Sequence, residues 1–243
     1  MGGFLGAVSL LTRVPVRSGD DLARAAGWLP TVGALIGFAV AGVYVGLLHA
    51  VPPAAAAIVA IAAGVVLTGA LHEDGLADVA DAFGARADRA RTLEILKDPR
   101  HGTYGVLALI LSVGARAAAL AAMSASSALV ALPAAHALAR GAAAAQLGLL
   151  PPATDEGLGA RYASTPRRAL LATMSALAIG SLTIGAWTVP AALLAAAAAA
   201  LMGAMAVGKI GGVTGDVLGA SEQLAETAIL LLCAGAEVDP WIS

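Results

Sequence analysis

The stretch PPAAAAIVAIAAGVVLTGALHEDGLADVAD, residues 52–81, decides what kind of protein this chain forms. Its first half is an apolar run, and four carboxylates, those of Glu73, Asp74, Asp78 and Asp81, follow within nine positions. An apolar run of this length is typical of a helix that crosses a membrane. Ionisable groups beside such a helix are costly, so the acidic group calls for a functional explanation.

The whole chain shares this apolar character. It has 243 residues, of which 59% are hydrophobic and 12% are charged, and its mean hydropathy is +0.86. A soluble domain carries about 25% charged residues, so the composition predicts an integral membrane protein. The net charge of -2 offers no basic face to nucleic acid. The single cysteine, Cys233, excludes an intrachain disulfide and a cysteine-rich metal site.

Polar residues and prolines divide the chain into seven predicted transmembrane segments. We therefore expect an all-α fold, a polytopic transmembrane helical bundle in which residues 1–243 form a single integral membrane domain. Residues 1–29 are expected to form an interfacial N-terminal segment, because their positive charge follows the apolar stretch, whereas a signal peptide carries it first. The last predicted span has only about 14 residues, which is short for a full crossing, so we expect it to be tilted, re-entrant or partly interfacial. The predicted spans are 30–50, 54–71, 105–124, 129–150, 169–188, 191–208 and 223–236.

The basic residues predict the orientation of the chain in the membrane. Most of the 14 lysines and arginines lie in four segments that share one side if the seven spans alternate. The positive-inside rule places that side in the cytoplasm, so we expect a multi-pass protein of the cell membrane. Residues 72–104 and 208–222 lie on the same side and are predicted to be cytoplasmic active-site loops. The four segments contain Arg13, Arg17 and Arg24; Arg86, Arg89, Arg91, Lys97 and Arg100; Arg161, Arg167 and Arg168; and Lys209.

The acidic group has the spacing of one helix face. Asp74, Asp78 and Asp81 stand four and three positions apart, which brings their side chains onto one stripe. Carboxylates on one stripe repel one another unless a cation lies between them, and Mg²⁺ prefers oxygen ligands that it often shares with phosphates. We predict that all three bind Mg²⁺ and that Asp81, together with Asp78, serves as the catalytic proton acceptor. Glu73 points about 100° away from Asp74, so it is a further candidate outside the stripe.

A glycine-rich segment, GKIGGVTGDVLGA at residues 208–220, is a second polar island on this side. Its glycines permit close approach of the backbone to a ligand, and backbone N–H groups beside a lysine can cradle a phosphate or diphosphate. Asp216 would complete the metal shell, and a flexible turn is the alternative interpretation. The predicted phosphate-binding residues of this segment are Lys209, Gly212, Thr214 and Gly215.

Charged residues elsewhere complete the candidate site. The segment KDPRHGTYG, residues 97–105, offers Arg100 for anion binding, although ordinary basic flanking of a span is an alternative. Arg140 lies inside a predicted span, where an unpaired arginine is costly, so it is expected to pair with an acidic group or a substrate phosphate. Arg116 either does the same or extends to the membrane interface. His136 and Glu226 are expected to form interhelical hydrogen bonds, and the further site candidates are His72, Glu73, Asp98 and His101.

Several motifs, taken together, resemble one family, the cobalamin synthases. The resemblance implies an integral membrane enzyme, an adenosylcobinamide-GDP ribazoletransferase, which needs Mg²⁺. Such an enzyme joins adenosylcobinamide-GDP to α-ribazole or α-ribazole 5′-phosphate, releases GMP and forms adenosylcobalamin or its 5′-phosphate. Asp74, Asp78 and Asp81 match the acidic signature of the family, and Asp216 matches its second glycine-rich motif. The motifs are LLTRVPV (10–16), WLPTVGALIG (28–37), TGALHEDGLADVADAFGAR (68–86), ILKDPRHGTYG (95–105) and GGVTGDVLGA (211–220).

Two other functions remain open on the residues alone. A CDP-alcohol phosphotransferase of lipid synthesis uses a similar membrane aspartate cluster, but its signature needs Ala-Arg after Asp-Gly, and here Leu76, Ala77 and Asp78 follow. A cation transporter would need ionisable groups near the bilayer midplane, whereas these carboxylates gather at one face. The expected partners are the two substrates and the lipid bilayer, and the sequence leaves open whether the chain forms a homo-oligomer.

Overall fold

The computed structural model describes residues 2–17, 22–155, 164–236 and 238, with the side chains of Leu22 and Ala23 left aside. Within these residues the chain is helical, and its one β-bridge joins Pro152 to Val213. The helices are α1 (Gly2–Leu11), η1 (Leu22–Trp28), α2 (Leu29–Leu47), α3 (Pro53–Thr68), α4 (Leu71–Gly84), α5 (Arg89–Ile95), α6 (Thr103–Ala121), α7 (Ala125–Leu149), α9 (Pro166–Ile184), η2 (Gly185–Trp187), α10 (Thr188–Ile210) and α11 (Gly215–Gly235).

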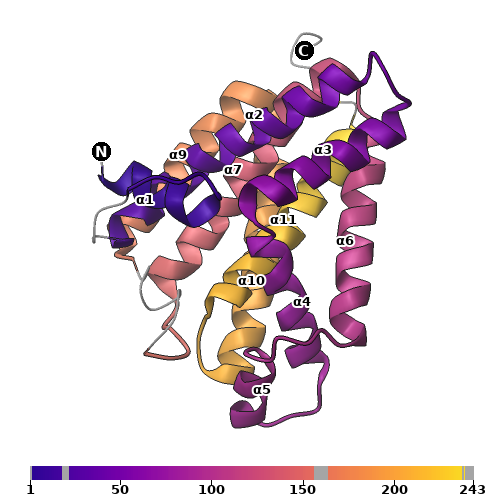
Figure 1. Cartoon of the computed structure of the whole chain (residues 1–243). Helices are drawn as coiled ribbons and strands as arrows, with labels where there is room; N and C mark the ends of the chain where they lie inside the picture. The colour runs from indigo at the N-terminus through magenta and orange to yellow at the C-terminus, as the bar shows by residue number, and fades with distance from the viewer. Residues whose placement is uncertain (1, 18–21, 156–163, 237, 239–243) are drawn as a thin grey trace.

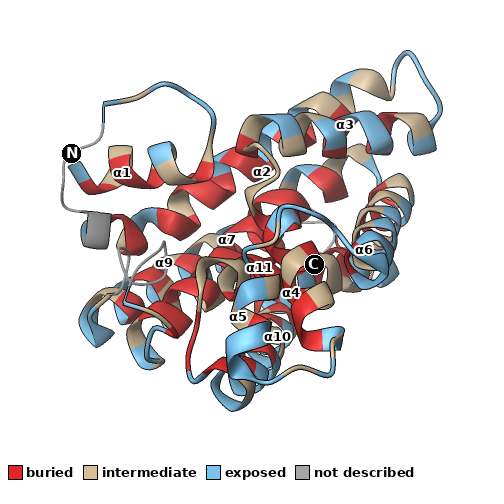
Figure 2. Ribbon diagram, turned by 60° about the horizontal axis from the view of Figure 1, so that its bottom comes forward, coloured by how far each residue is buried: buried red, intermediate tan, exposed pale blue. Residues whose placement is uncertain are grey.

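Helices α7 and α11 form the centre of the bundle (Figure 1). Helix α7 packs mainly against α2 and α9, and α11 packs against α4, α7 and α10. Buried residues follow these two helices, while α3 and α6 expose large apolar side chains on their outer faces (Figure 2). Exposed apolar surface of this extent suits contact with lipid rather than with water.

Five helical stretches are long and apolar enough to cross a membrane, and a sixth is obtained if α3 and α4 are counted as one bent span. One of the five covers 45 residues, but Gly185, with φ of 55°, divides it into α9 and α10. Thr188 packs back against Gly180, so the chain reverses at this point. These two helices match the predicted spans 169–188 and 191–208. The fold is therefore the all-α polytopic membrane bundle that the composition predicts.

Glycines allow the central helices to approach closely. An added Cβ would lie 2.7 Å from the carbonyl oxygen of His136 at Gly33, and 2.6 Å from that of Leu132 at Gly37. Because lipid offers no hydrophobic drive between helices, close backbone packing of this kind is a main source of their association. The motif WLPTVGALIG thus has a structural role, which is to seat α2 on α7.

The second predicted span, 54–71, extends beyond the end of the helix that the structure shows. Helix α3 ends at Thr68, and α4 leaves it at an angle of 91°. Gly69 and Ala70 both have left-handed backbone conformations, with φ of 68° and 59°, and these produce the bend. The sequence conceals the break because Ala70 has no preference for positive φ. The acidic stripe consequently lies on a separate helix.

The last predicted span, 223–236, covers only part of the helix that the structure shows. Helix α11 begins at Gly215 and has 21 residues, so it is long enough to cross a membrane. Thr214 caps it, since its hydroxyl accepts a hydrogen bond from the backbone N–H of Val217. Much of the two segments predicted as loops, 72–104 and 208–222, is helical as well, in α4, α5 and the start of α11.

Gly75 brings α4 against the beginning of α11. A Cβ at Gly75 would lie 2.8 Å from the backbone oxygen of Asp216 and 2.9 Å from its Cα. Gly219 makes the reciprocal approach to the backbone of His72. Asp74 and Asp216 therefore share one region because glycine stands at these two contacts.

We predict that Gly75→Ala lowers the stability of the protein in detergent by about 1–3 kcal/mol, because a methyl group there must displace backbone rather than a flexible side chain. Gly114→Ala is the matched control. An added Cβ at Gly114 meets no atom within 4 Å, so alanine there is expected to stabilise α6 by up to about 1 kcal/mol. Thermal unfolding of both variants tests the prediction, which is wrong if the two midpoints move together.

Candidate active site

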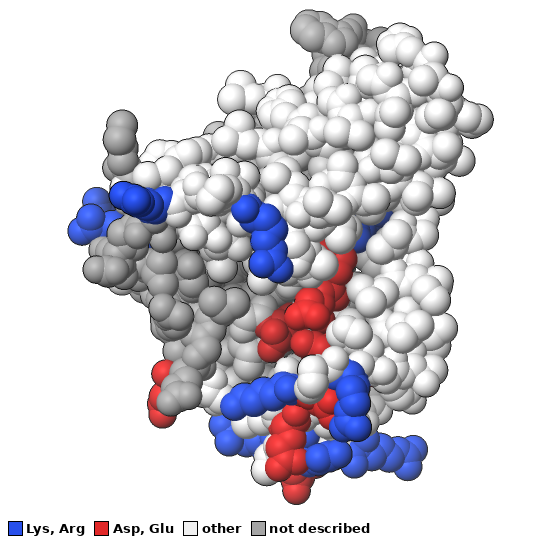
Figure 3. Space-filling view, in the orientation of Figure 1, with Lys and Arg blue, Asp and Glu red and all other residues white. Residues whose placement is uncertain are grey.

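A cavity of about 160 Å³ lies between α1, α4, α7 and α11. Asp74 and Asp216 line it from two different helices, and Arg140 lines it from a third. Its remaining wall is mostly leucine from α1, α2, α4, α7 and α11, together with His72, alanine and glycine. In the space-filling view of Figure 3, acidic side chains gather in the middle of the visible face, with basic side chains around them. The cavity thus combines carboxylates, one guanidinium and an apolar wall.

Asp78 lies one turn from Asp74 on α4 and is partly buried. Helix α4 by itself is not one of the five apolar stretches. Burial, and next the negative charges of Asp74 and Asp216, raise the pKa of Asp78 to about 6. His101 lies above the stripe, with Nδ1 3.7 Å from Asp78 Oδ1 and Nε2 4.0 Å from Asp74 Oδ1. The surroundings of Asp78 therefore increase its affinity for a proton.

Asp81 uses both carboxylate oxygens to hold the start of α6. Its Oδ2 accepts a hydrogen bond of 2.6 Å from the backbone N–H of Gly102, and its Oδ1 accepts one of 2.9 Å from that of Gly105. An added Cβ at either glycine would collide with this carboxylate. The interaction fixes the segment 97–105 over α4. The catalytic role of Asp81 stays a prediction, but the structure gives its two oxygens positioning partners.

The glycine-rich segment forms a tight turn between α10 and α11. Gly211 ends α10 with φ of 83°, and an added Cβ at Gly212 would collide with the carbonyl oxygen of Pro151. Arg89 ties the turn to α5, because its Nε donates to the carbonyl of Ile210 at 3.0 Å. Two of the predicted cradle residues, Gly212 and Thr214, thus have packing and capping functions. Their binding of phosphate stays a prediction, as does that of Gly215.

The predicted cations of this side lie outside the cavity. Lys209 lies in the last turn of α10, with Nζ 5.9 Å from the centre of the Phe83 ring. Arg100 is exposed and forms an ion pair of 2.7 Å with Asp98. Hydrogen bonds from Arg100 lower the pKa of Asp98 to about 2. Neither cation lines the cavity that holds Asp74 and Asp216.

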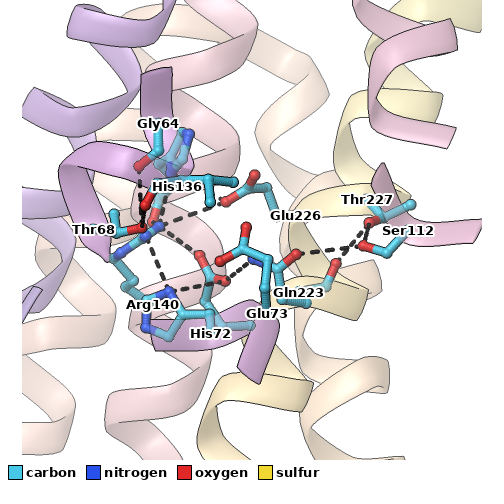
Figure 4. A network of polar contacts seen from close by, with 12 residues as sticks. Gly64, Thr68, His72, Glu73, Ser112, His136, Arg140, Gln223, Glu226 and Thr227 are labelled. Carbon is cyan, nitrogen blue, oxygen red and sulfur yellow. Dashed lines mark hydrogen bonds and ion pairs between the residues drawn. The ribbon is translucent and has the colours of Figure 1, made fainter. Parts of the chain in front are cut away.

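A buried network of ion pairs adjoins the cavity, since His72 and Arg140 belong to both (Figure 4). Arg116 reaches Glu73 on α4 and Glu226 on α11, each at 3.0 Å. Arg140 pairs with Glu222 on α11, and its Nη1 lies 2.8 Å from Nδ1 of His136. Both arginines are less than 5% exposed. The prediction that Arg140 pairs with an acidic group is confirmed, as are the interhelical contacts of His136 and Glu226.

Glu222 is the main residue of this network that the sequence interpretation missed. It is fully buried, and it contacts Arg140 and Nδ1 of His72, the latter at 3.3 Å. Its signal in the sequence was the spacing Glu222–Glu226, one helical turn inside an apolar segment. The predicted boundary at residue 223 separated the two glutamates and concealed this pattern.

A search for metal ligands distinguishes the buried network from the cavity. In the described part of the chain, only His136, Glu222 and Glu226 bring three potential ligand atoms within 4.8 Å of one another. Arg116 and Arg140 form ion pairs with the glutamates of this group, so their positive charges already compensate the carboxylates. The carboxylates at the cavity are less tightly gathered. They have no lysine or arginine partner among the described residues, which is the condition that suits a hard cation.

A larger cavity of about 750 Å³ opens between α7, α9 and α10. Its wall is alanine, glycine and leucine, with Gln146 and Thr173 as its polar side chains. It contains no ionisable group and so lacks the means to move a proton or to bind a phosphate. Of these two cavities, the smaller one is therefore the one whose wall carries ionisable side chains.

Comparison with known proteins identifies the family of the chain. The sequence profile of the cobalamin-5-phosphate synthases matches residues 3–234. The chain belongs to this family. Relatives named adenosylcobinamide-GDP ribazoletransferase include those of Bradyrhizobium diazoefficiens, which is 42% identical over 96% of this chain and 93% of the relative, and Azorhizobium caulinodans, 42% identical over 93% and 92%. The relative from Rhizobium etli strain CIAT 652 is 42% identical over 95% of both chains.

Membership of the cobalamin-5-phosphate synthases confirms the family resemblance seen in the motifs. It makes the chain a transferase of cobalamin synthesis, and its apolar helices make it a membrane protein. No solved structure matches the chain. The roles of individual site residues therefore depend on the geometry of this chain itself.

We predict that Arg116→Met destabilises the protein by about 3–5 kcal/mol, because it leaves Glu73 and Glu226 buried without their shared cation. Arg91→Gln, which breaks the exposed pair with Glu94, is expected to cost less than about 1 kcal/mol. Chemical unfolding in detergent measures both variants. Equal effects would contradict the burial argument.

Proposed function

We propose that this enzyme transfers the adenosylcobinamide-phosphate group of adenosylcobinamide-GDP to α-ribazole, or to α-ribazole 5′-phosphate, with release of GMP. The name of the relatives supports the choice of substrates. The structural observation that carries the proposal is the acidic cavity, where Asp74 and Asp216 face Arg140. Its volume suits the diphosphate alone, so the corrinoid and guanosine would extend outward from it.

The reaction exchanges one bond to phosphorus for another. A ribose hydroxyl of the acceptor attacks the phosphorus next to the cobinamide, and the bond from that phosphorus to the oxygen of GMP breaks. The hydroxyl loses its proton to a base on the enzyme, and GMP leaves with the electron pair. Because a product that retains the 5′-phosphate is expected from the phosphorylated acceptor, the attacking hydroxyl belongs to another ribose position.

Asp78 is the group we assign to accept this proton. A base works best when its pKa is near the working pH, and the pKa of Asp78 is raised to about 6. Asp81 fits the task less well, because backbone N–H groups already bind its carboxylate. His101, at 3.7 Å from Asp78, is placed to orient the carboxylate.

Mg²⁺ is the proposed cofactor, and Asp74 and Asp216 are the residues that would hold it. Their carboxylates face one cavity from different helices, and carboxylate oxygens are the donors that this ion prefers. The bound ion would supply positive charge against the diphosphate as charge shifts to the leaving group. Asp78, one turn from Asp74 on α4, remains available for the proton because it is not among the residues assigned to the metal.

We propose that this chemistry takes place at the cytoplasmic face of the cell membrane. In the view of Figure 3, basic side chains lie around the acidic side chains in the middle and are absent from the upper right. The positive-inside rule assigns the basic side to the cytoplasm. The family match favours this reaction over the two alternatives, lipid phosphotransfer and cation transport.

We expect purified enzyme in detergent to release GMP from adenosylcobinamide-GDP and α-ribazole only when Mg²⁺ is present. Chelation by EDTA should abolish release, and added Mg²⁺ should restore it. Asp74→Asn is expected to raise the Mg²⁺ concentration required for half-maximal rate, while Glu94→Gln, an exposed site on α5, leaves it unchanged. Full turnover in EDTA would refute the metal proposal, and no turnover in any condition would refute the reaction.

We expect kcat/KM to fall as the pH drops through about 6, because protonated Asp78 is unable to accept a second proton. Asp78→Asn should lower the rate by about 10²–10⁴-fold and remove this acidic limb from the profile. Rates measured from pH 5 to pH 8 test both statements. A variant that keeps the limb would show that another group titrates.

A further inference from the structure

The motif LLTRVPV, residues 10–16, contributes Leu10 and Leu11 to the wall of the acidic cavity, but its arginine, Arg13, has no role in the metal site or the proton transfer described above. It links α1 to the rest of the bundle, and its position is well fixed. Thr12 Oγ1 donates to the carbonyl of Val8 at 2.8 Å and accepts from the backbone N–H of Val14 at 3.2 Å. The backbone N–H of Arg13 donates to the carbonyl of Leu67 at 2.8 Å. These bonds place Arg13 at the end of α3, next to the bend.

The side chain of Arg13 lies across Gly69. If Gly69 carried a Cβ, that atom would lie 2.8 Å from Cζ and 2.9 Å from Cδ of Arg13, and closer still to Nε. The guanidinium therefore occupies the space that any other residue would fill with its own side chain. Gly69 is required here for two reasons, since its φ of 68° also disfavours other residues. The bend between α3 and α4 thus provides a seat for one arginine.

This seat adjoins the acidic cavity. Leu10 and Leu11, just before Arg13, line the cavity, and so do Leu71 and Asp74, just after the bend. Arg13 is exposed, and its guanidinium has no hydrogen bond or ion pair with any described residue. Arg140, which lines the cavity from α7, is by contrast buried and paired with Glu222. Arg13 is consequently an exposed cation next to residues that line the cavity, and its side-chain donors have no partner among the described residues.

We propose that Arg13 binds the diphosphate of the nucleotide substrate, by donating to phosphate oxygens at the entrance of the acidic cavity. This inference rests on the proposed function, because the diphosphate it names is that of adenosylcobinamide-GDP. A guanidinium offers paired N–H donors that match two phosphate oxygens, whereas a lysine supplies only a point charge. Arg13 then neutralises the face of the diphosphate that is turned away from Asp74 and Asp216.

Steady-state kinetics of Arg13→Gln in the intact enzyme test this role. The KM for adenosylcobinamide-GDP is expected to rise about tenfold or more, as for the loss of a charged hydrogen bond, while the KM for α-ribazole stays constant. Arg13→Lys should give a smaller increase. Arg17→Gln is the matched control, an exposed arginine of the same linker, and should leave both KM values unchanged. A merely structural role would lower the melting temperature or affect both substrates alike.

Two further measurements separate this inference from the reaction itself. Inorganic pyrophosphate with Mg²⁺ is expected to raise the melting temperature of wild type and Arg17→Gln but not of Arg13→Gln, a result that needs no turnover. Gly69→Ala should weaken pyrophosphate binding although Arg13 is present, because the methyl group displaces the guanidinium. The inference is overturned if Arg13→Gln matches Arg17→Gln in both KM and pyrophosphate response. Absence of wild-type turnover would instead count against the proposed reaction.

Discussion

The ion pairs of Arg116 and Arg140 with three glutamates are the interaction on which the rest of the site depends. Arg116 joins α4 and α11 through Glu73 and Glu226, and Arg140 joins α7 to α11 through Glu222. Charges in such a place are costly unless each has its partner. With each charge paired in this way, they fix which faces of α4, α6, α7 and α11 meet. Glu73 is next to Asp74 in α4, and Glu222 lies further along α11 from Asp216. The two arginines bind these glutamates, and this brings Asp74 and Asp216 to one cavity.

Glycine provides the second constraint, which is distance. Gly75 and Gly219 bring α4 and α11 together, and Gly33 leaves room for the side chain of Arg140 between α2 and α7. The glycines of the motifs therefore act mainly by permitting contact between helices and loops. The prediction that the glycine-rich turn binds phosphate depends on a different property of glycine, its ability to adopt positive φ. Gly211 has this conformation, with φ of 83°.

Composition and periodicity predicted the fold class and the helical stripe, because both depend on properties that each residue carries locally. The bend at Ala70 escaped prediction because its conformation is imposed by tertiary contacts, including that of Arg13 with Leu67. The start of α11 was misplaced because glycine and threonine in GGVTGD are typical of a loop, yet Thr214 is a helix cap. The hydrogen bonds of Asp81 to Gly102 and Gly105 were likewise beyond reach, since they join segments that only the fold brings together.

The distance in sequence between the partners of the buried network has a consequence for biosynthesis. Arg116 is separated from Glu226 by 110 residues, so the ribosome completes α4, α6 and α7 well before it makes α11. Until then, the nascent chain holds two arginines among apolar helices without most of their counter-charges. Helix α11 is thus the last part of the network to be made, and the two arginines gain most of their counter-charges only when it packs.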